Sequence, residues 1–444
     1  EQQMTPLKIL FISSMPPDHS AGLARDFMKA MRLHGHEVDF LTRYSFPGQT
    51  EGEYSVYPEN LSIKIRRWKD KHPFIKKNLR FLKFLLKKDE VIKNKDKGIN
   101  ITCLREDLPT VPIKDVLKKI NKQYDLVVTV FWQHMVTTCT LKAIYDKLHC
   151  PIIIRSVDME TFTGGCFYFM NCRNFTHECG CCPALNSNDA NDQTHLNFLK
   201  KKEMYSQMNY AIGFNTWMQQ FSRRSGLFEA SRIITTSCAI DESIFKPIDK
   251  GDCRKALDIP SDKTFVMFAR RTGIIFKPKG FAHLIKAVNL FVDGLTEEER
   301  KKCLLILAGQ SLEDCRPWLH VDTMYLGQLT RDFLIKAYNA SNVFLSPSID
   351  DAGPSMVNQS IMCGTPVVCF NIGTAIDVIS NGLSGYKVAI KDDDAFASAI
   401  DTVYKLPTNQ YEQLSKTTRE MALKHNSLES FANMIESTYS KLSH

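Results

Sequence analysis

The chain has 444 residues, of which 43% are hydrophobic and 24% charged, and its formal net charge is +8. This length exceeds one ordinary hydrophobic core and predicts two domains of about 200 residues each. No run of about 18 apolar residues and no signal-peptide pattern occurs, and the fourteen cysteines are not spaced as in a small disulfide scaffold, so we expect a cytoplasmic protein without transmembrane helices.

The first half of the chain alternates apolar runs with helical patterns. A loop around Gly22 leads from the first apolar run into a helical pattern, as at the start of a βαβ unit. The later runs are continuously apolar, which is typical of buried parallel strands. The predicted strands are residues 7–13, 37–41, 125–131, 151–155, 210–214 and 232–237.

Polar residues follow two of these strands. His134 comes after the strand at 125–131, and Asp158 comes after the strand at 151–155. The carboxyl ends of parallel strands face the ligand crevice, so both side chains are candidates for a site. Either residue could instead cap the next helix, and for His134 we favour that interpretation.

Residues 64–97 hold the basic excess of the chain. Fourteen Lys and Arg face four acids in this segment, and apolar residues recur within it at helical spacing. Such a helix can lie on an anionic membrane surface, each basic side chain near the surface contributing about 1 kcal/mol. It can equally be a surface helix that packs on its own domain. Nucleic-acid binding is a weaker interpretation, because the aromatic residues share the packing face.

Five cysteines lie between residues 166 and 182. Four of them, Cys166, Cys172, Cys179 and Cys182, have the spacing C-x5-C-x6-C-x2-C, which can surround one tetrahedral Zn²⁺ ion. A metal held by four thiolates would be structural and not catalytic. An iron–sulfur cluster, a partial disulfide and free thiols are the alternatives.

The second half is centred on residues 346–370, which read as the end of a strand, a loop, a helix and another strand. In a parallel sheet this order places the turn at Gly353 and Ser355 at a helix N-terminus, where backbone amides can hold an anion. Asp351 and Gln359 flank the turn, so that both could reach one ligand. The alternative is an ordinary βαβ corner with a polar rim. The predicted strands of this half are residues 264–269, 304–308, 343–345 and 366–370.

The second half resembles family 4 of the glycosyltransferases, over most of residues 230–440. This resemblance depends on several short motifs that occur in the same order as in that family. The first half, with Gly22 and the cysteines, is similar to a subgroup that builds bacterial surface polysaccharides. The motifs are Phe268-Ala269-Arg270, Lys279-Gly280-Phe281, Ala308-Gly309-Gln310, Ser346-Pro347-Ser348, Asn358-Gln359-Ser360, Cys363-Gly364-Thr365-Pro366 and Gly373-Thr374-Ala375.

The resemblance implies a fold and a set of site residues. The fold is GT-B, an α/β architecture of two Rossmann-like domains that face a cleft. Arg270 and Lys279 would hold the diphosphate of a nucleotide sugar, assisted by the amides of Ser355 and Met356. Asp351 would contact sugar hydroxyls and Gln359 the ribose, although the family usually has Glu at both positions. The family's usual His in the first domain is replaced by Val157, beside Asp158.

We therefore expect an acceptor-binding domain at 1–247, a nucleotide-sugar-binding domain at 248–426 and a C-terminal helix, 427–444, that returns to the first domain. The expected activity is transfer of a sugar, with retention, from a UDP- or GDP-sugar to a glycan or lipid-linked acceptor, without a catalytic metal. The predicted site comprises Arg270, Lys279, Asp351 and Asp158 for catalysis, and Gly22, Gly353, Ser355, Met356 and Gln359 for the donor. The basic segment would attach the enzyme to the inner face of the membrane. A nucleotide-sugar epimerase and a zinc-stabilised protein that binds without catalysis are the alternatives.

Overall fold

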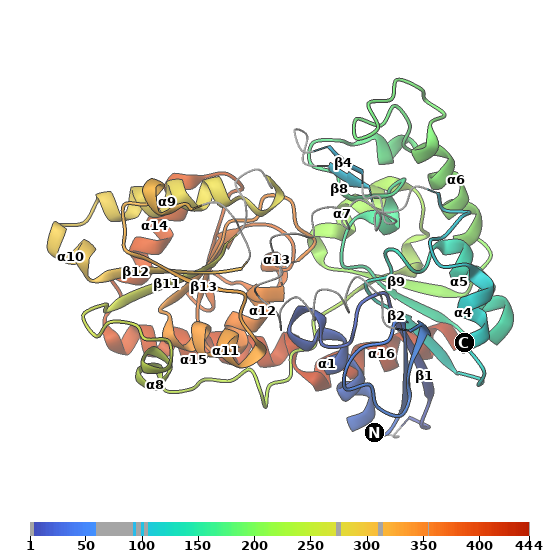
Figure 1. Cartoon of the computed structure of the whole chain (residues 1–444), viewed down its shortest axis with the longest axis horizontal. Helices are drawn as coiled ribbons and strands as arrows, with labels where there is room; N and C mark the ends of the chain where they lie inside the picture. Colours follow the sequence, from blue (N-terminus) through green and yellow to red (C-terminus); the bar gives the residue numbers. More distant parts are fainter. Residues whose placement is uncertain are drawn as a thin grey trace, which may run out of the picture.

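The computed structural model describes residues 4–58, 92–94, 99–101, 105–271, 277–309, 314–353 and 355–443. Over these residues the chain forms two α/β domains that lie next to each other (Figure 1). Most of the basic segment, including the helix predicted in it, falls outside the described residues. No helix in the described ranges is both long and apolar enough to cross a membrane.

The first domain is built on a parallel sheet whose seven described strands pair in the order β10-β9-β7-β6-β1-β2-β3. Its central strands are buried along almost their whole length, which is why continuous apolar runs mark them in the sequence. Every strand predicted in this half is present, and β3 is an additional one. The strands are β1 (Lys8–Ser13), β2 (Glu37–Tyr44), β3 (Glu53–Tyr57), β6 (Leu126–Thr129), β7 (Ile152–Arg155), β9 (Tyr210–Phe214) and β10 (Ile233–Thr235).

Helices connect these strands and begin at recognisable caps. Asn215 accepts a hydrogen bond from the backbone N–H of Met218, and Asp192 accepts from that of Thr194, so each side chain satisfies a donor of the first turn. The helices are α1 (His19–Leu33), α4 (Ile113–Lys119), α5 (Thr138–Leu148), α6 (Gln193–Tyr205) and α7 (Thr216–Ser225), with short 3-10 turns η2 (Glu160–Phe162), η3 (Asn174–His177) and η4 (Ala230–Arg232).

A small antiparallel sheet extends from the first domain and carries the start of the cysteine-rich segment. Its strands pair in the order β4-β5-β8. They are β4 (Ile92–Asn94), β5 (Ile99–Ile101) and β8 (Cys166–Tyr168). Strand β8 therefore holds Cys166 and Tyr168 beside β5, at the edge of the domain (Figure 1).

The second domain has a parallel sheet with the order β13-β12-β11-β14-β15-β16 among the described strands. The strands are β11 (Phe265–Arg270), β12 (Cys303–Ala308), β13 (Thr323–Gly327), β14 (Val343–Ser346), β15 (Val367–Phe370) and β16 (Gly385–Val388). The helices are α8 (Lys250–Ala256), α9 (Phe281–Asp293), α10 (Glu297–Lys301), α11 (Arg331–Ala340), α12 (Ser355–Met362), α13 (Ala375–Val378), α14 (Asp393–Tyr404) and α15 (Thr408–Asn426), with 3-10 turns η5 (Lys277–Lys279) and η6 (Arg316–Trp318).

The last helix, α16 (Leu428–Ser443), packs on the first domain (Figure 1). The rings of Phe27 in α1 and Phe431 in α16 stack with their centroids 4.5 Å apart. One carboxylate oxygen of Glu436 lies 2.9 Å from a ring nitrogen of His34 and 2.9 Å from one of His36. These apolar and polar contacts hold α16 against the first helix of the chain.

The chain passes between the domains twice, after β10 and again between α15 and α16. The two passages contact each other, because the backbone N–H of Ile240 donates to the carbonyl of Asn426 at 2.8 Å. The N–H of Leu428 also donates to the carboxylate of Glu242 at 3.2 Å. The two connecting segments are therefore hydrogen-bonded to each other between the domains.

An ion pair joins the domains beside the predicted Gly22 loop. The guanidinium of Arg331, at the start of α11, lies 2.7 and 2.9 Å from the two carboxylate oxygens of Asp26 in α1. The Asp26 side chain is 3% exposed, and its carboxylate also accepts from the N–H of Asp241 at 3.1 Å. Gly22 is close to the same arginine, since a Cβ at this position would lie 3.0 Å from the guanidinium.

Substituting Arg331 by alanine is expected to lower the free energy of unfolding by about 3 kcal/mol, because the Asp26 carboxylate stays buried without its countercharge. Chemical denaturation of both proteins measures this difference. Arg316→Ala is the matched control, since Arg316 pairs with Asp314 at an exposed site and its loss should cost less than about 1 kcal/mol. Equal effects of the two substitutions would contradict the importance of the link between the domains.

Candidate active site between the domains

A cavity of about 180 Å³ lies between the two domains. Arg270, Lys279 and Ser355 line it from the second domain, and Phe131 and Tyr168 line it from the first. The carboxyl ends of strands from both parallel sheets reach the cavity, which is where ligands bind in open α/β sheets. The remaining lining residues are Leu23, Arg155, Ser156, Val157, Phe167, Asn215, Thr236, Cys238, Asp351, Ala352, Gly353, Asn358 and Thr374.

Lys279 and Asp351 form an ion pair in this cavity. The Lys279 ammonium bonds the carboxylate of Asp351, and both side chains are largely buried, at 15% and 8% exposure. Burial acts to lower the pKa of Lys279, but the Asp351 carboxylate and the Tyr168 oxygen outweigh it, so the pKa is raised. The lysine is therefore held as a cation in the cavity.

The backbone around Lys279 is fixed by the loop that carries Asp351. The carbonyl of Pro278 accepts from the N–H groups of Ile349 and Asp350, at 2.9 and 3.2 Å. Gly280 follows in a left-handed conformation with φ of 65° and is the N-cap of α9. The positive φ favours glycine at position 280, and the close packing of the backbone there leaves no room for a larger side chain. Both features place Lys279 beside the loop.

Arg270 is the last residue of β11 and is exposed where it lines the cavity. Its charge opposes protonation of Lys279, so the two cations are near each other. Burial and, secondly, the charge of Arg270 lower the pKa of His19, at the start of α1. Arg270 thus adds a second cation at the carboxyl end of the sheet.

Helix α12 contributes its first turn to the cavity. Gly353 and Ser355 line the cavity, and so does Asn358, one helical turn further on. Met356 is partly buried against the hydrophobic core. The first amides of an α-helix have no partner within the helix, so this end can supply N–H donors to an anion.

Gln359 is placed differently from the predicted ribose contact. Its side chain is 2% exposed, and its amide oxygen accepts from the hydroxyl of Tyr338 at 3.1 Å. It is not among the described residues that line the cavity. Successive helical residues are turned by about 100°, so Asn358 faces the cavity while Gln359 packs against α11.

Three predicted residues of the first domain lie outside the cavity lining. Asp158 is 1% exposed, bonds the amide of Gln133 and accepts from the N–H of Glu160 at 2.8 Å. Burial and then the charge of Glu160 raise the pKa of Asp158. Gly22 lies next to Arg331, although its neighbour Leu23 lines the cavity. His134 is also absent from the described lining.

Several lining residues had no sequence signal as site residues. Asn215, the N-cap of α7, donates from its side-chain amide to the carbonyl of Ala352 in the second domain. The N–H of Thr216 donates to the carboxylate of Asp377 at 3.0 Å. Phe131 has a positive φ of 50°, and its carbonyl accepts from the hydroxyl of Ser14 at 2.6 Å. Asn215 follows directly after β9, and this position at the carboxyl end of a parallel strand is the signal that could have found it.

The four predicted zinc ligands line one small, mainly apolar cavity in the first domain. Nevertheless, no group of three or more His, Cys, Asp or Glu side chains among the described residues is arranged to hold a metal ion. Burial raises the pKa of the thiols of Cys166, Cys179 and Cys182, which favours the neutral form. The prediction of a structural zinc site is therefore not supported.

The neighbour of Asp351, Asp350, is a buried carboxyl group. One oxygen accepts from the N–H of Met170 at 2.7 Å, and the other has no hydrogen-bond partner in the described part of the chain. Burial raises the pKa of Asp350 to about 7, although the charges of Arg173 and Lys279 act to lower it. This carboxyl group thus takes up a proton more readily in the folded chain than in the unfolded one.

A pH-dependent stability follows from this shift. The pKa of Asp350 is about 7 in the folded state and 3.8 in the reference state, so protonation of this carboxyl group favours folding. The free-energy penalty of its buried charge therefore falls as the pH drops. Asp350→Asn should remove about 2 kcal/mol of the difference in unfolding free energy between about pH 5 and about pH 8. Denaturation at both pH values tests this, with Asp252→Asn as the exposed control. An unchanged pH difference in Asp350→Asn would refute it.

The fold corresponds to the two-domain GT-B arrangement. Residues 249–421 match the family described as "Glycosyl transferases group 1". The solved structures similar to the whole chain include sucrose-phosphate synthase from Thermosynechococcus elongatus, with a TM-score of 0.64, 15% identity and coverage of 98% and 99% of the two chains. HepE from Anabaena in complex with UDP-glucose has a TM-score of 0.62, 14% identity and coverage of 98% and 100%. The predicted GT-B fold is confirmed.

Curated relatives match only part of the chain. An uncharacterised glycosyltransferase of Methanocaldococcus jannaschii is 26% identical over 162 residues, which are 35% of this chain and 39% of the relative. A D-inositol 3-phosphate glycosyltransferase of Saccharomonospora viridis is 26% identical over 200 residues, which are 42% of this chain and 45% of the relative. The chain thus spans less than half the length of these relatives. Both relatives, and the family that matches residues 249–421, are named as glycosyltransferases.

Proposed function

We propose that this protein is a glycosyltransferase that moves a sugar from a nucleotide-diphosphate donor to a glycan or lipid-linked acceptor. The observation that carries the proposal is the presence of Arg270, Lys279 and the first turn of α12 in one cavity between the domains. The family match at 249–421 covers all three. The complex of HepE with UDP-glucose supports a uridine diphosphate sugar as the first donor to test.

The cations would act on the leaving group. As the bond from the sugar to the diphosphate breaks, negative charge grows on the diphosphate, and fixed cations and N–H dipoles stabilise that charge. Lys279 and Arg270 provide the cations, and the amides of Ser355 and Met356 provide dipoles. The ammonium of Lys279 would exchange part of its pairing with Asp351 for the diphosphate, which frees the carboxylate to accept hydrogen bonds from sugar hydroxyls.

We further propose that transfer occurs with retention and serves surface polysaccharide synthesis, as the resemblance to family 4 implies. The first domain, with Phe131, Phe167 and Ser156 in the cavity, would present the acceptor. The basic segment at 64–97 would bring the enzyme to an anionic membrane surface where lipid-linked acceptors reside. The anomeric configuration of the product, determined by NMR, tests retention.

Nucleotide binding is the direct test of the proposed function. Thermal-shift measurements with UDP, GDP and ADP should show stabilisation by at least one, because a ligand at about 100 times its Kd adds about 2.7 kcal/mol. Donor screening by mass spectrometry then identifies the transferred sugar. The absence of any stabilisation by these nucleotides would refute the proposal.

A binding protein without turnover is the second candidate, and the position of Gln359 outside the described cavity lining favours it. An epimerase of the same fold needs no acceptor. Release of nucleoside diphosphate that depends on an added acceptor would exclude both, whereas nucleotide binding without any release would favour the binding protein.

A further inference from the structure

The cysteine-rich segment, residues 159–192, contacts the second domain through Tyr168. Phe167 and Tyr168 at the end of β8 line the cavity between the domains. The centroid of the Tyr168 ring lies 5.7 Å from the ammonium nitrogen of Lys279. Tyr168 is 7% exposed, so the first domain supplies a buried aromatic face to a cation of the second.

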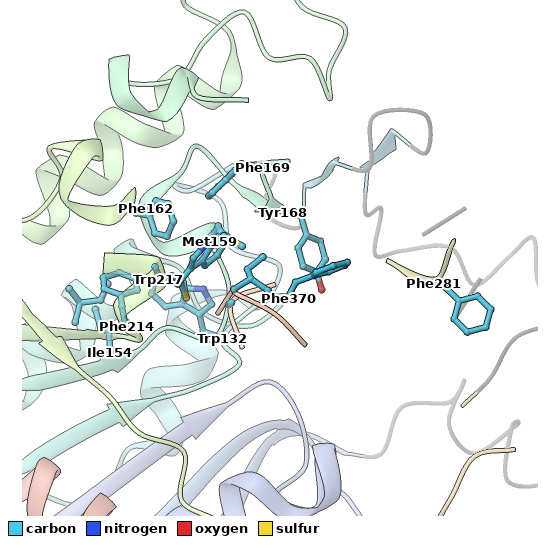
Figure 2. Close-up of a cluster of buried hydrophobic side chains, with 14 of the residues drawn as sticks. Trp132, Ile154, Met159, Phe162, Tyr168, Phe169, Phe214, Trp217, Phe281 and Phe370 are labelled. Atoms are coloured by element: carbon cyan, nitrogen blue, oxygen red, sulfur yellow. The ribbon is translucent and has the colours of Figure 1, made fainter. Parts of the chain in front are cut away.

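The backbone on both sides of Tyr168 is fixed within the first domain. The carbonyl of Phe167 accepts from the N–H of Met159 at 3.3 Å, and the carbonyl of Cys166 accepts from the hydroxyl of Thr163 at 3.0 Å. The next residue, Phe169, packs on Phe175 with ring centroids 5.1 Å apart. In Figure 2 Phe169 lies with the aromatic cluster of the first domain, and Tyr168 lies on the side of that cluster facing Phe370. The ring is therefore held on a rigid support.

A second contact fixes the same segment to the loop that carries Asp351. The N–H of Met170 donates to the Asp350 carboxylate at 2.7 Å. Tyr168 and Met170 thus contact the second domain at Lys279 and at Asp350, the neighbour of the lysine's ion-pair partner. The arrangement aligns the aromatic ring with the Lys279–Asp351 pair.

We propose that Tyr168 is a positioning residue for the nucleotide donor, whose ring and hydroxyl oxygen keep the Lys279 ammonium in the cavity when the lysine turns from Asp351 to the diphosphate. This inference rests on the proposed function. An aromatic face attracts a cation through its quadrupole but carries no net charge. It therefore holds the lysine without competing with the phosphate, as a second carboxylate would.

Both parts of Tyr168 act on Lys279: the hydroxyl oxygen favours the charged ammonium, and the ring lies beside it. Tyr168→Phe keeps the ring and should bind UDP within about threefold of the wild-type affinity. Tyr168→Leu removes the ring and should weaken UDP binding about tenfold, the change that corresponds to about 1.4 kcal/mol of lost cation–aromatic attraction. Rescue by phenylalanine distinguishes this role from general packing.

A matched control is available in the second domain. The ammonium of Lys250 lies 4.5 Å from the ring centroid of Tyr411, away from the cavity lining. Tyr411→Leu should lower the Tm but leave UDP affinity within about twofold of wild type. The experiment measures UDP affinity by calorimetry and the Tm for wild type, Tyr168→Phe, Tyr168→Leu and Tyr411→Leu, together with the donor KM and kcat. Tyr168→Met replaces Tyr168→Leu if the latter does not fold.

The outcomes separate this inference from the function on which it rests. A wild-type protein that binds no nucleoside diphosphate refutes both. Wild-type binding with an unchanged affinity in Tyr168→Leu refutes the role of Tyr168 alone. An equal loss in Tyr168→Phe and Tyr168→Leu refutes the contribution of the ring, because the hydroxyl would then account for the whole effect. A tenfold loss in Tyr168→Leu alone, at an unchanged Tm, supports it.

Discussion

Replacing Lys279 by alanine is expected to lower the rate of sugar transfer by about 1,000-fold. The substitution removes the buried cation that faces the departing diphosphate, and loss of one such stabilising group in an enzyme typically costs about 100- to 1,000-fold in kcat. Steady-state kinetics with the donor found by screening measures the effect. Because Lys279 is proposed to act on developing charge, the loss should appear mainly in kcat.

The control for this substitution must separate chemistry from stability. Lys279→Ala leaves the Asp351 carboxylate buried without its partner, so the double variant Lys279→Ala/Asp351→Asn should regain stability but not activity. Lys286→Ala is the control with an exposed lysine. Lys286 lies in α9, its side chain is 62% exposed, and it pairs with Asp393. Unchanged turnover in folded Lys279→Ala would remove Lys279 from the proposed site.

The second large effect is expected at Gly280. A Cβ atom at this position would lie 1.8 Å from the carbonyl oxygen of Pro347, and the residue has a φ of 65°. A backbone atom cannot move aside as the end of a side chain can, so the loop that carries Asp351 must shift. Gly280→Ala should therefore lower the free energy of unfolding by about 4 kcal/mol and displace Lys279 as well.

Gly294 provides the matched glycine for this experiment. It follows α9 with a φ of −79°, and a Cβ there would be 3.4 Å from the nearest carbonyl oxygen, a normal contact distance. Gly294→Ala should change stability by less than about 1 kcal/mol. Chemical denaturation and nucleotide affinity are measured for both variants. Wild-type stability in Gly280→Ala would show that the close approach of the two loops is not needed.

The sequence predicts best the elements whose burial is complete. Strands β6 and β7 are buried on both faces, and their apolar runs located them within a few residues. Strands β13 and β16 are mostly half-buried, and neither was predicted. A parallel strand near the edge of a sheet is defined by its partner as much as by its own residues, so its local pattern is weak.

The candidate site was predictable where a motif fixes the backbone. Lys279 and Gly353 fall beside turns with glycines, and both line the cavity. Tyr168 and Asn215 reach the same cavity from elements far away in the sequence, and only the packing of the two domains brings them there. The ribose contact of Gln359 was implied by the resemblance to family 4, and a sequence motif does not determine which of two adjacent helical residues turns toward a ligand.

The paired connections between the domains have a consequence for motion. A single linker permits twisting as well as bending, but two adjoining linkers tied by the Ile240 to Asn426 hydrogen bond resist twisting. The two domains should then open and close by rotation about one axis, which runs along the paired linkers. Asn426 also donates to the side-chain oxygen of Asn358, at 3.1 Å, so this axis passes beside a residue that lines the cavity.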